Sequence, residues 1–252
     1  MKILSIVIFI ISIYILGSCS AYKMSSSDFI PTHVLESGVT YPVMTSGLNP
    51  GEITGLLYLG PVSHIALIGN GNGKMLDDTL SNISEQLLDK IVSDFKTNIP
   101  LSGEAEVHDE ATKSELEKEI EHLCKVVIEL NGISDINLTP VIDSLLKSNN
   151  KRFGLITVAE GYTRTKDNIN ANKALQVAGI TANFLSGNII PYVPRRVTKA
   201  SSTLFVMIVD ADLNNITFFR KCIKHAEPTD GNVLSDQFRK IFEGFYIKLI
   251  IK

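Results

Sequence analysis

Apolar residues recur at spacings of three and four along two long stretches of the chain, which is the pattern of an amphipathic helix. The first stripe covers residues 76–95 and has two aspartates in its first turn, where acidic side chains favour a helix start. The second covers residues 116–130, behind Thr112 and Glu115 in capping-box register and ahead of Gly132 as a stop. We therefore predict two long helices in these stretches.

Three further helices follow from shorter patterns. Thr139 and Pro140 suit a helix start, because proline is tolerated in the first turn, and an asparagine pair at 149–150 ends that helix. Residues 170–187 are rich in alanine and low in charge, which predicts a helix or a helical hairpin. An apolar stripe over residues 234–245 predicts a C-terminal amphipathic helix.

Short apolar runs between these stretches predict the strands. The run "HIALIG" at 64–69 is bounded by glycine, and residues 98–107 and 152–164 also suit strands. Residues 202–224 predict two strands joined by a turn at 213–215. The resulting order is strand, helix, strand, helix, helix, strand, helical insertion, strand, strand, helix. This order predicts an α/β fold with a mixed sheet and helices packed on its faces.

The N-terminus has the pattern of an export signal, with Lys2 ahead of a mostly apolar run over residues 3–16. Leu16-Gly17-Ser18-Cys19 then resembles the lipobox of bacterial lipoproteins, in which the signal is cut before a lipidated cysteine. We predict residues 1–18 as a lipoprotein signal peptide and Cys19 as the lipid-bearing N-terminus of the mature chain, with palmitate as an acyl chain. The alternative is an ordinary secretory signal with an incidental cysteine.

The rest of the chain divides into a tether and a domain. Residues 19–52 comprise the lipidated cysteine, a serine-rich tether and a segment with turn residues that we expect on the surface. Residues 53–252 are predicted as one α/β domain with a helical insertion at about residues 170–190.

The net charge argues against one class of partner, and the cysteine count limits the possible disulfides. Without residues 1–18 the chain has 23 basic and 27 acidic residues, a formal charge of −4, so nucleic acid is not an expected partner. Cys124 and Cys222 remain once Cys19 carries the lipid. They either pair in an oxidising envelope or lie buried apart, and the sequence leaves both open.

The glycine-rich stretch behind the first predicted strand, "GNGNGK" at 69–74, invites comparison with a phosphate-binding loop. A Walker A loop ending in Gly73-Lys74 would need glycine at position 68 and a hydroxyl at 75, where the chain has Ile68 and Met75. A dinucleotide fingerprint fails as well, because its third glycine would fall on Lys74. We therefore predict a plain glycine turn and no nucleotide.

The remaining polar motifs do not predict chemistry. Residues 210–215, "DADLNN", begin like a calcium loop, but Asn215 stands in place of the required glycine and Lys221 in place of the glutamate, so a polar hairpin turn is expected. The five histidines have no partners at metal-ligand spacing, and neither a serine elbow nor a cysteine signature is present. We predict no metal, no cofactor, no catalytic residue and no enzymatic activity.

The alanine-rich insertion is the part of the domain where we expect contact with other molecules. Ala174, Ala178 and Ala182 recur at four-residue spacing and form a small-residue strip, with Phe184 beside it as apolar bulk. These four residues are candidate interface residues. Residues 171–194 are compatible with burial against the domain, which we slightly favour, with a protein–protein surface, or with membrane contact.

Several of these elements together resemble a known group of proteins. They are "HIALIG" with its following helix, "RFGLITVAEGYT", the hairpin "TLFVMIVDADLNNITFF" and the closing helix. With the lipobox, they resemble small bacterial lipoproteins related to the curli secretion channel and to the lipoprotein activators of penicillin-binding proteins, over roughly residues 60–250. In the channel branch, the segment after the corresponding strand supplies membrane-spanning hairpins, whereas the insertion here is short and alanine-rich.

Together these features predict a lipid-anchored cell-envelope protein that faces the periplasm from the outer membrane. We expect it to act as a non-enzymatic module that binds an unidentified envelope protein or itself. The alternative is an oligomeric accessory subunit of an envelope secretion or transport system, with residues 171–194 near the membrane. A third class, an envelope hydrolase, would require a cleft of clustered polar residues.

Overall fold

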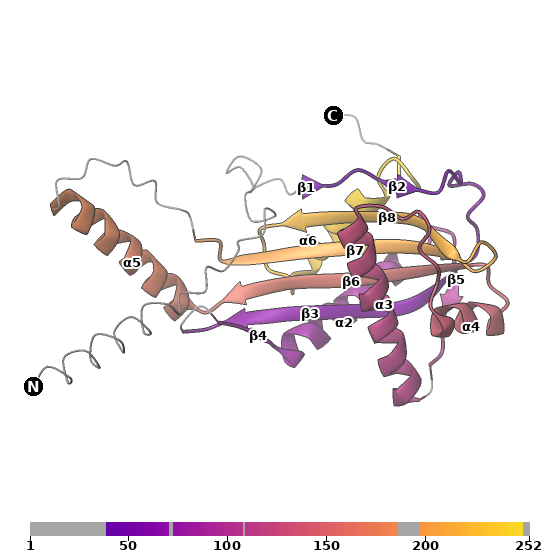
Figure 1. Ribbon diagram of the computed structural model, residues 1–252, viewed down its shortest axis with the longest axis horizontal. Coiled ribbons are helices and arrows are strands. Elements are labelled where there is room, and N and C mark those ends of the chain that lie inside the picture. The colour runs from indigo at the N-terminus through magenta and orange to yellow at the C-terminus, as the bar shows by residue number, and fades with distance from the viewer. Residues whose placement is uncertain (1–38, 71–72, 108, 186–196, 249–252) are drawn as a thin grey trace, which may run out of the picture. The chain divides into compact units, whose positions relative to one another are not determined.

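The described part of the chain forms a mixed sheet of eight strands in the order β1-β8-β7-β6-β3-β4, with β2 also on β8 and β5 also on β3 (Figure 1). The computed structural model describes residues 39–70, 73–107, 109–185 and 197–248. The long central strands are β3 (Leu56–Ile68), β6 (Phe153–Arg164), β7 (Ala200–Asp210) and β8 (Asn215–Lys224). Strands β3 and β6 are parallel, and the pairs β6–β7 and β7–β8 are antiparallel. The predicted α/β fold with a mixed sheet is confirmed.

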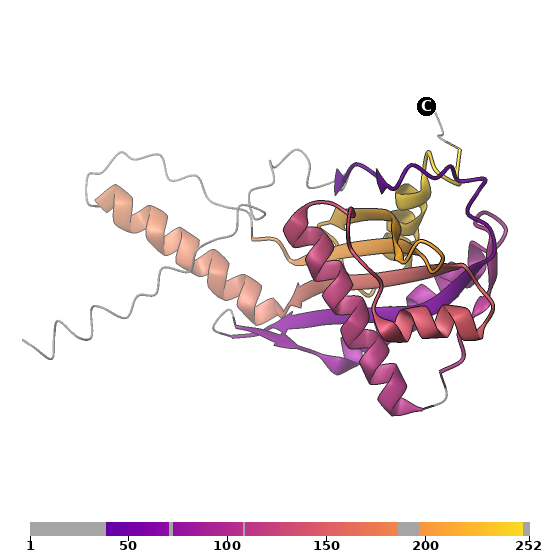
Figure 2. The same cartoon turned by 45° about the vertical axis from the view of Figure 1, so that its right-hand side comes forward.

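Helices cover both faces of the sheet. Helices α3 (Glu110–Leu130) and α4 (Pro140–Ser148) lie on one face, and α2 (Asp78–Asp94) and α6 (Gly231–Phe242) lie on the other, as Figures 1 and 2 both show. Since side chains alternate along a strand, β6 feeds both cores: Ile156 packs with the α3 side and Leu155 with the α6 side. A sheet buried on both faces explains why these strands read as continuous apolar runs.

The chain around the glycine stretch differs from the prediction. Leu76 is not the first residue of the helical stripe but the last residue of a short strand, β4 (Lys74–Leu76), which pairs antiparallel with the end of β3. Asp77 is the N-cap of α2, and its carboxylate accepts the backbone N–H of Leu80 at 3.0 Å. The glycine stretch therefore connects a hairpin rather than a strand and a helix, which a 3.6-residue period cannot reveal.

The start of α3 also differs. The predicted capping box with Thr112 as the cap is wrong, because Asp109 caps the helix and accepts the backbone N–H of Thr112 at 2.8 Å. The predicted end is close to the observed one. Asn131 adopts a left-handed conformation with φ of 49°, and the N–H of Gly132 donates to the carbonyl of Val127 at 3.3 Å.

The sheet extends further towards the N-terminus than predicted. Residues 56–59, which precede the strand predicted at 64–69, are buried within β3, and β1 (Val39–Thr40) and β2 (Met44–Thr45) pair with β8. Gly60 interrupts β3 at a bulge with φ of +89°, a conformation that favours glycine. Because the bulge shifts the alternation of inward and outward side chains, the sequence pattern does not reveal that the residues before and after it belong to one strand.

Both long edges of the sheet are closed. The outer edge of β8 is covered by β1 and β2, and β3 is paired with β5 (Leu101–Glu104) at one end and with β4 at the other. In the stretch of β3 between β5 and β4, side chains of α2 accept the backbone hydrogen bonds. The N–H group of Ser63 donates to Glu85 at 3.2 Å, and the N–H group of Ile65 donates to Ser81 at 3.0 Å. An edge strand with its backbone groups occupied is a poor template for another strand.

The two described cysteines are free and lie on opposite faces of the sheet. Cys124 belongs to the core under α3 and Cys222 to the core under α6. Burial raises the pKa of the Cys124 thiol to about 12 and also raises the pKa of Cys222. Of the two possibilities left open by the sequence, the structure shows thiols buried apart.

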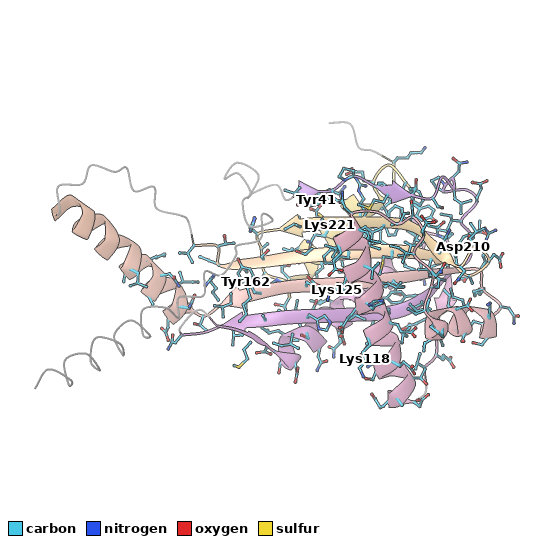
Figure 3. All side chains as sticks on the ribbon, in the orientation of Figure 1. Tyr41, Lys118, Lys125, Tyr162, Asp210 and Lys221 are labelled. Carbon is cyan, nitrogen blue, oxygen red and sulfur yellow. The ribbon has the colours of Figure 1, made fainter. Side chains whose placement is uncertain are left out.

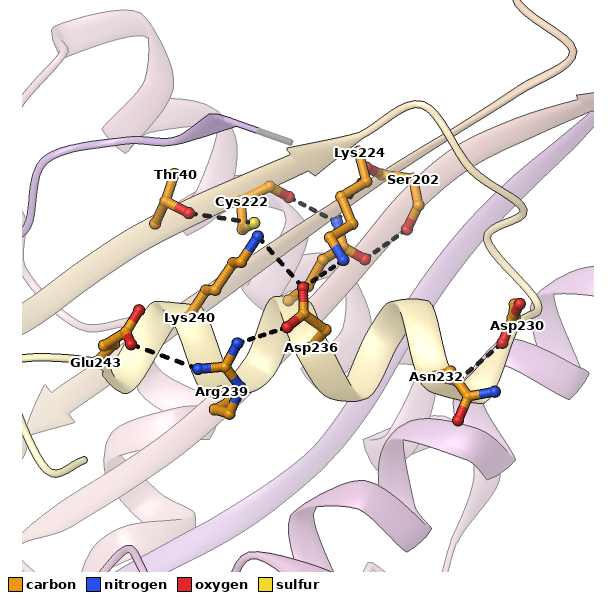
Figure 4. A network of polar contacts seen from close by, with 11 residues as sticks. Thr40, Ser202, Cys222, Lys224, Asp230, Asn232, Asp236, Arg239, Lys240 and Glu243 are labelled. Carbon is orange, nitrogen blue, oxygen red and sulfur yellow. Dashed lines mark hydrogen bonds and ion pairs between the residues drawn. The ribbon is translucent and has the colours of Figure 1, made fainter. Parts of the chain in front are cut away.

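Helix α6 is fixed to the sheet by the buried Gln237 as well as by apolar packing, and Figure 4 shows the polar contacts of this helix with Ser202 and Lys224 of the sheet. The Nε2 group of Gln237 donates to the carbonyls of Ser202 at 3.0 Å and Cys222 at 2.8 Å, and its Oε1 accepts from the Ser202 hydroxyl at 2.8 Å. These three bonds satisfy a side chain with no exposed surface. They fix α6 in one register on β7 and β8.

Beside it, Asp236 pairs with three cations, Lys224, Arg239 and Lys240. Partial burial by itself raises the pKa of Asp236, but hydrogen bonds from Lys224 and Arg239 and the charge of Lys240 outweigh it, so that the pKa lies well below its ordinary value. Because the pKa of Asp236 is lower in the folded chain than in the unfolded chain, the ionised carboxylate stabilises the fold at any pH above its ordinary pKa. This stabilisation is lost as the pH falls from the ordinary pKa towards the lowered one.

We expect Asp236→Asn to lower the free energy of unfolding by about 1 kcal/mol at neutral pH, because the pairs are only partly buried. The difference from the wild type should shrink as the pH falls below about 4, where the carboxylate of the unfolded chain becomes protonated. Urea denaturation at pH 7 and at pH 3 measures both values. Glu227→Gln, at an exposed position, is the control, and a difference independent of pH would contradict the prediction.

Candidate functional site

The residues predicted to contact other molecules lie in α5 (Lys166–Leu185) or outside the described residues. Cys19 is outside them. Ala174 and its neighbour Leu175 are exposed, so burial against the domain, which the sequence slightly favoured, is wrong for these two residues. Ala178, Ala182 and Phe184 lie within the same helix, but their side chains are outside the described part of the structure.

Helix α5 follows β6 directly and extends beyond the end of the sheet in Figures 1 and 2. Its first turn is held by a polar cluster in which Asn168 is almost fully buried. Arg164 donates to Asn168 at 2.8 Å and to the carbonyl of Thr198 at 3.1 Å, and Asn168 donates to the carbonyl of Gly69 at 2.7 Å. These bonds connect the helix start to the β3–β4 hairpin and to the chain entering β7. They explain why the helix begins at Lys166 rather than near residue 170.

On the side of α3, the sheet surface nearest α5 is not covered by a helix, as Figures 1 and 2 show. Because Val62 and Val158 pack under α3, the alternating residues that follow them point to the same side. We call this surface the open half-sheet. Its residues come from β3, β4 and β6, and they are His64, Ala66, Lys74, Leu76, Glu160 and Tyr162.

Tyr162 is the central aromatic residue of the open half-sheet (Figure 3). The Lys74 ammonium lies 5.3 Å from the centre of its ring and the Arg164 guanidinium lies 5.5 Å away. Lys74 is thus exposed on a strand beside an aromatic ring, and it does not follow a strand into a helix as a phosphate-binding lysine does. The predicted glycine turn itself lies partly outside the described residues, which omit residues 71 and 72.

A groove of about 350 Å³ lies between α3 and the open half-sheet, and its lining combines charged side chains with a larger apolar surface. Within it, His64 and Glu121 are hydrogen bonded at 2.8 Å, and Glu160 stands beside His64 on the neighbouring strand. Partial burial raises the pKa of Glu160. Cys124 lies at the base of the groove, but its raised pKa keeps the thiol protonated and so unsuited to act as a nucleophile. The hydrogen bond between His64 and Glu121 therefore connects β3 to α3, and it orients no activated nucleophile in the groove.

A polar cleft, of about 470 Å³, lies between α2, α3, β3 and the end of β5. It gathers four acidic residues from three elements: Glu85, Asp89, Glu104 and Glu117. Burial, with like charges nearby, raises the pKa values of Glu85 and Asp89. The sequence did not indicate this cluster, because its members come from elements separated by up to 32 positions.

The predicted hairpin turn at residues 210–215 is confirmed, and Asp210 has a structural role there. Its carboxylate has no exposed surface and accepts from Arg152 at 2.7, 3.0 and 3.1 Å. It also accepts the backbone N–H groups of Asp212 and Leu213. Among the described residues, no group of three or more histidine, cysteine or acidic side chains is arranged to hold a metal ion.

Comparisons with known proteins do not identify a family. No family model and no curated protein matches the chain. Among solved structures, a PelC dodecamer from Paraburkholderia phytofirmans is similar with a TM-score of 0.36 and 8% identity, over 84% of this chain and 99% of that one. A variant of the same dodecamer gives a TM-score of 0.31 and 9% identity over the same shares. Both TM-scores are below 0.5, so neither likeness supports an inference about this chain.

No helix within the described ranges combines the length and the apolar character that a bilayer crossing requires.

Proposed function

We propose that this protein is an exported, lipid-anchored cell-envelope protein that acts by binding another envelope protein or a second copy of itself, without catalysing a reaction. The lipobox at Leu16–Cys19 supports the anchor and a position on the periplasmic side of the outer membrane. The resemblance to envelope lipoproteins over roughly residues 60–250 supports the same setting.

The observation that carries the binding role is the exposed middle of α5, at Ala174 and Leu175. Leu175 is 68% exposed on a helix that extends beyond the sheet, and Ala174 beside it is exposed as well. In the sequence, Ala178 and Ala182 follow Ala174 at four-residue spacing, and such a strip of small residues permits the close approach of a second helix. Because both long edges of the sheet are closed, association through added strands is disfavoured, and α5 is the more favourable contact.

Leu175→Glu tests this role. The substitution should weaken assembly or partner binding by about tenfold or more, because a charge replaces an apolar contact at the interface. Folding should be unaffected, since the side chain is 68% exposed. Sedimentation and affinity capture from detergent-solubilised envelopes measure the binding, and thermal unfolding measures the stability.

Leu213→Glu is the matched control. Leu213 is 52% exposed in the β7–β8 turn, at the opposite end of β7 from the chain that leaves α5. This variant should assemble like the wild type. Equal binding by both variants and the wild type would show that α5 is not the contact surface.

The self-assembling form of the proposal is an oligomeric accessory subunit of a secretion or transport system. It is favoured by a second apolar group at the same end of the sheet, where Met75 and Leu76 in β4 are 71% and 56% exposed. Exposed apolar groups at one end of a molecule are typical of association surfaces. Sedimentation of the purified chain alone separates the two forms, because only the self-assembling form gives a defined oligomer without a partner.

The anchor requires its own test. Cys19→Ala should release the exported protein from membranes or block its processing, since only a thiol accepts the diacylglyceryl group. Membrane fractionation measures the release, and intact-mass analysis of the wild type measures the modification. An unmodified Cys19 in protein extracted from membranes would refute the anchor.

A further inference from the structure

A third pocket, of about 380 Å³, lies between the C-terminal part of α3 and the outer strands of the sheet. We call it the α3–β8 pocket. Its walls are mainly apolar, from Met44, Val127, Ile128 and Phe219, and its polar groups come from Tyr41, Asn131 and Lys221. Pockets of this size with apolar walls and few polar groups are typical of small-molecule sites.

The positive charge in this pocket is not neutralised by an ion pair. The Lys221 ammonium lies 4.2 Å from the centre of the Tyr41 ring, and Figure 3 labels both residues near the β8 edge of the sheet. Within the described residues, no carboxylate lies within ion-pair distance of Lys221, and Glu160 acts on it only at longer range. A partly buried ammonium with no described carboxylate in contact favours a ligand that carries a negative charge.

The walls restrict the shape of that ligand. The backbone N–H of Tyr41 already donates to the carbonyl of Lys221 at 3.0 Å, and the carbonyl of Tyr41 accepts from Arg220 at 2.9 Å. The opposite wall is the last turn of α3, where the carbonyls of Val127 and Ile128 accept from the backbone N–H groups of Gly132 and Asn131. The pocket therefore provides few partners for the backbone of a peptide, but it does provide contacts for a plain alkyl chain.

We propose that the α3–β8 pocket binds a medium-chain fatty acid, with the carboxylate on Lys221 and the alkyl chain against Met44, Ile128 and Phe219. A volume of about 380 Å³ accommodates roughly a dozen non-hydrogen atoms, if each takes about the 30 Å³ of a water molecule. A ten-carbon acid has this size. Ile128 is 42% exposed, so the pocket opens to solvent and the ligand enters without unfolding of the core.

Photo-crosslinking with a ten-carbon fatty acid tests the site in the full chain, purified from membranes in a non-ionic detergent. The probe carries a photoreactive diazirine on its alkyl chain, and mass spectrometry maps the labelled residues. We expect labelling of residues 41–44 and 127–131, competed by decanoate and not by decan-1-ol. Lys221→Met should reduce labelling by about tenfold, because the charge-assisted contact is lost, and Lys221→Arg should retain it.

Lys118→Met is the matched control, because it removes an exposed lysine of α3 away from the pocket (Figure 3). If Lys221→Met does not fold, Ile128→Glu provides the test, since it places a negative charge at the pocket mouth and should also reduce labelling. Equal labelling of wild type and Lys221→Met, or equal competition by decan-1-ol and decanoate, would overturn the proposal. Competition by a peptide with a free C-terminal carboxylate, but not by decanoate, would also overturn it in favour of a peptide ligand.

Discussion

Replacing Phe238 with alanine should lower the free energy of unfolding by about 4 kcal/mol, the largest loss that we expect from one side chain. Phe238 has no exposed surface and joins two helices under the sheet. Its ring centre lies 5.2 Å from that of Phe95, which follows α2, and 5.1 Å from that of Phe242 in α6. Truncation removes these contacts and leaves a cavity that the surrounding strands fill only in part.

Urea denaturation measures this loss. Phe238→Leu is the matched control, because it keeps an apolar side chain and should cost less, about 1–2 kcal/mol. A loss below about 1 kcal/mol for the alanine variant would mean that α6 repacks freely on the sheet. The buried bonds of Gln237 argue against such repacking, because they fix the register of the helix.

Replacing Asp210 with alanine should lower the free energy of unfolding by about 3 kcal/mol, because it removes a buried carboxylate that accepts from Arg152 and from two backbone N–H groups. The substitution leaves Arg152 and the backbone N–H groups of Asp212 and Leu213 without the acceptor that they share. The β7–β8 turn loses its internal bonds together with its connection to the start of β6. Most of the cost comes from the polar groups left unsatisfied.

Asp212→Ala is the control for this prediction. Its side chain is 69% exposed and also approaches Arg152, at 3.3 Å, so it tests the value of a surface pair at the same arginine. We expect a loss of no more than about 0.5 kcal/mol. Equal losses in the two variants would contradict the assignment of Asp210 as the structural residue of the turn.

Much of the fold follows from local patterns. The helix at α4 was predicted from its threonine-proline start, and α6 from its apolar stripe, because both patterns depend only on residues close in sequence. The β7–β8 hairpin was predicted from two apolar runs around a polar turn. Errors arose where a tertiary contact replaced the local rule. Leu76 fits the helical stripe but pairs with Ala66 across the sheet.

The candidate sites were less accessible to sequence reasoning. The α3–β8 pocket joins Tyr41, Ile128 and Lys221, which are separated by as many as 180 positions. No spacing rule connects such residues, since only the packing of α3 over the outer strands brings them together. Likewise, neither Lys221 nor Tyr41 had a local signal in the sequence that set it apart from other surface lysines and tyrosines.

The sequence by itself determined the α/β class, the order of the main elements and the prediction of a lipid-anchored N-terminus. The physical reason is that apolar periodicity, helix caps and a lipobox are encoded by neighbouring residues. Only the tertiary structure decided that Cys124 and Cys222 lie on opposite faces of the sheet and that Leu175 stays exposed. It also decided that α2 hydrogen bonds to the edge of β3 between β4 and β5. These properties depend on which segments pack together, and packing joins residues that are distant along the chain.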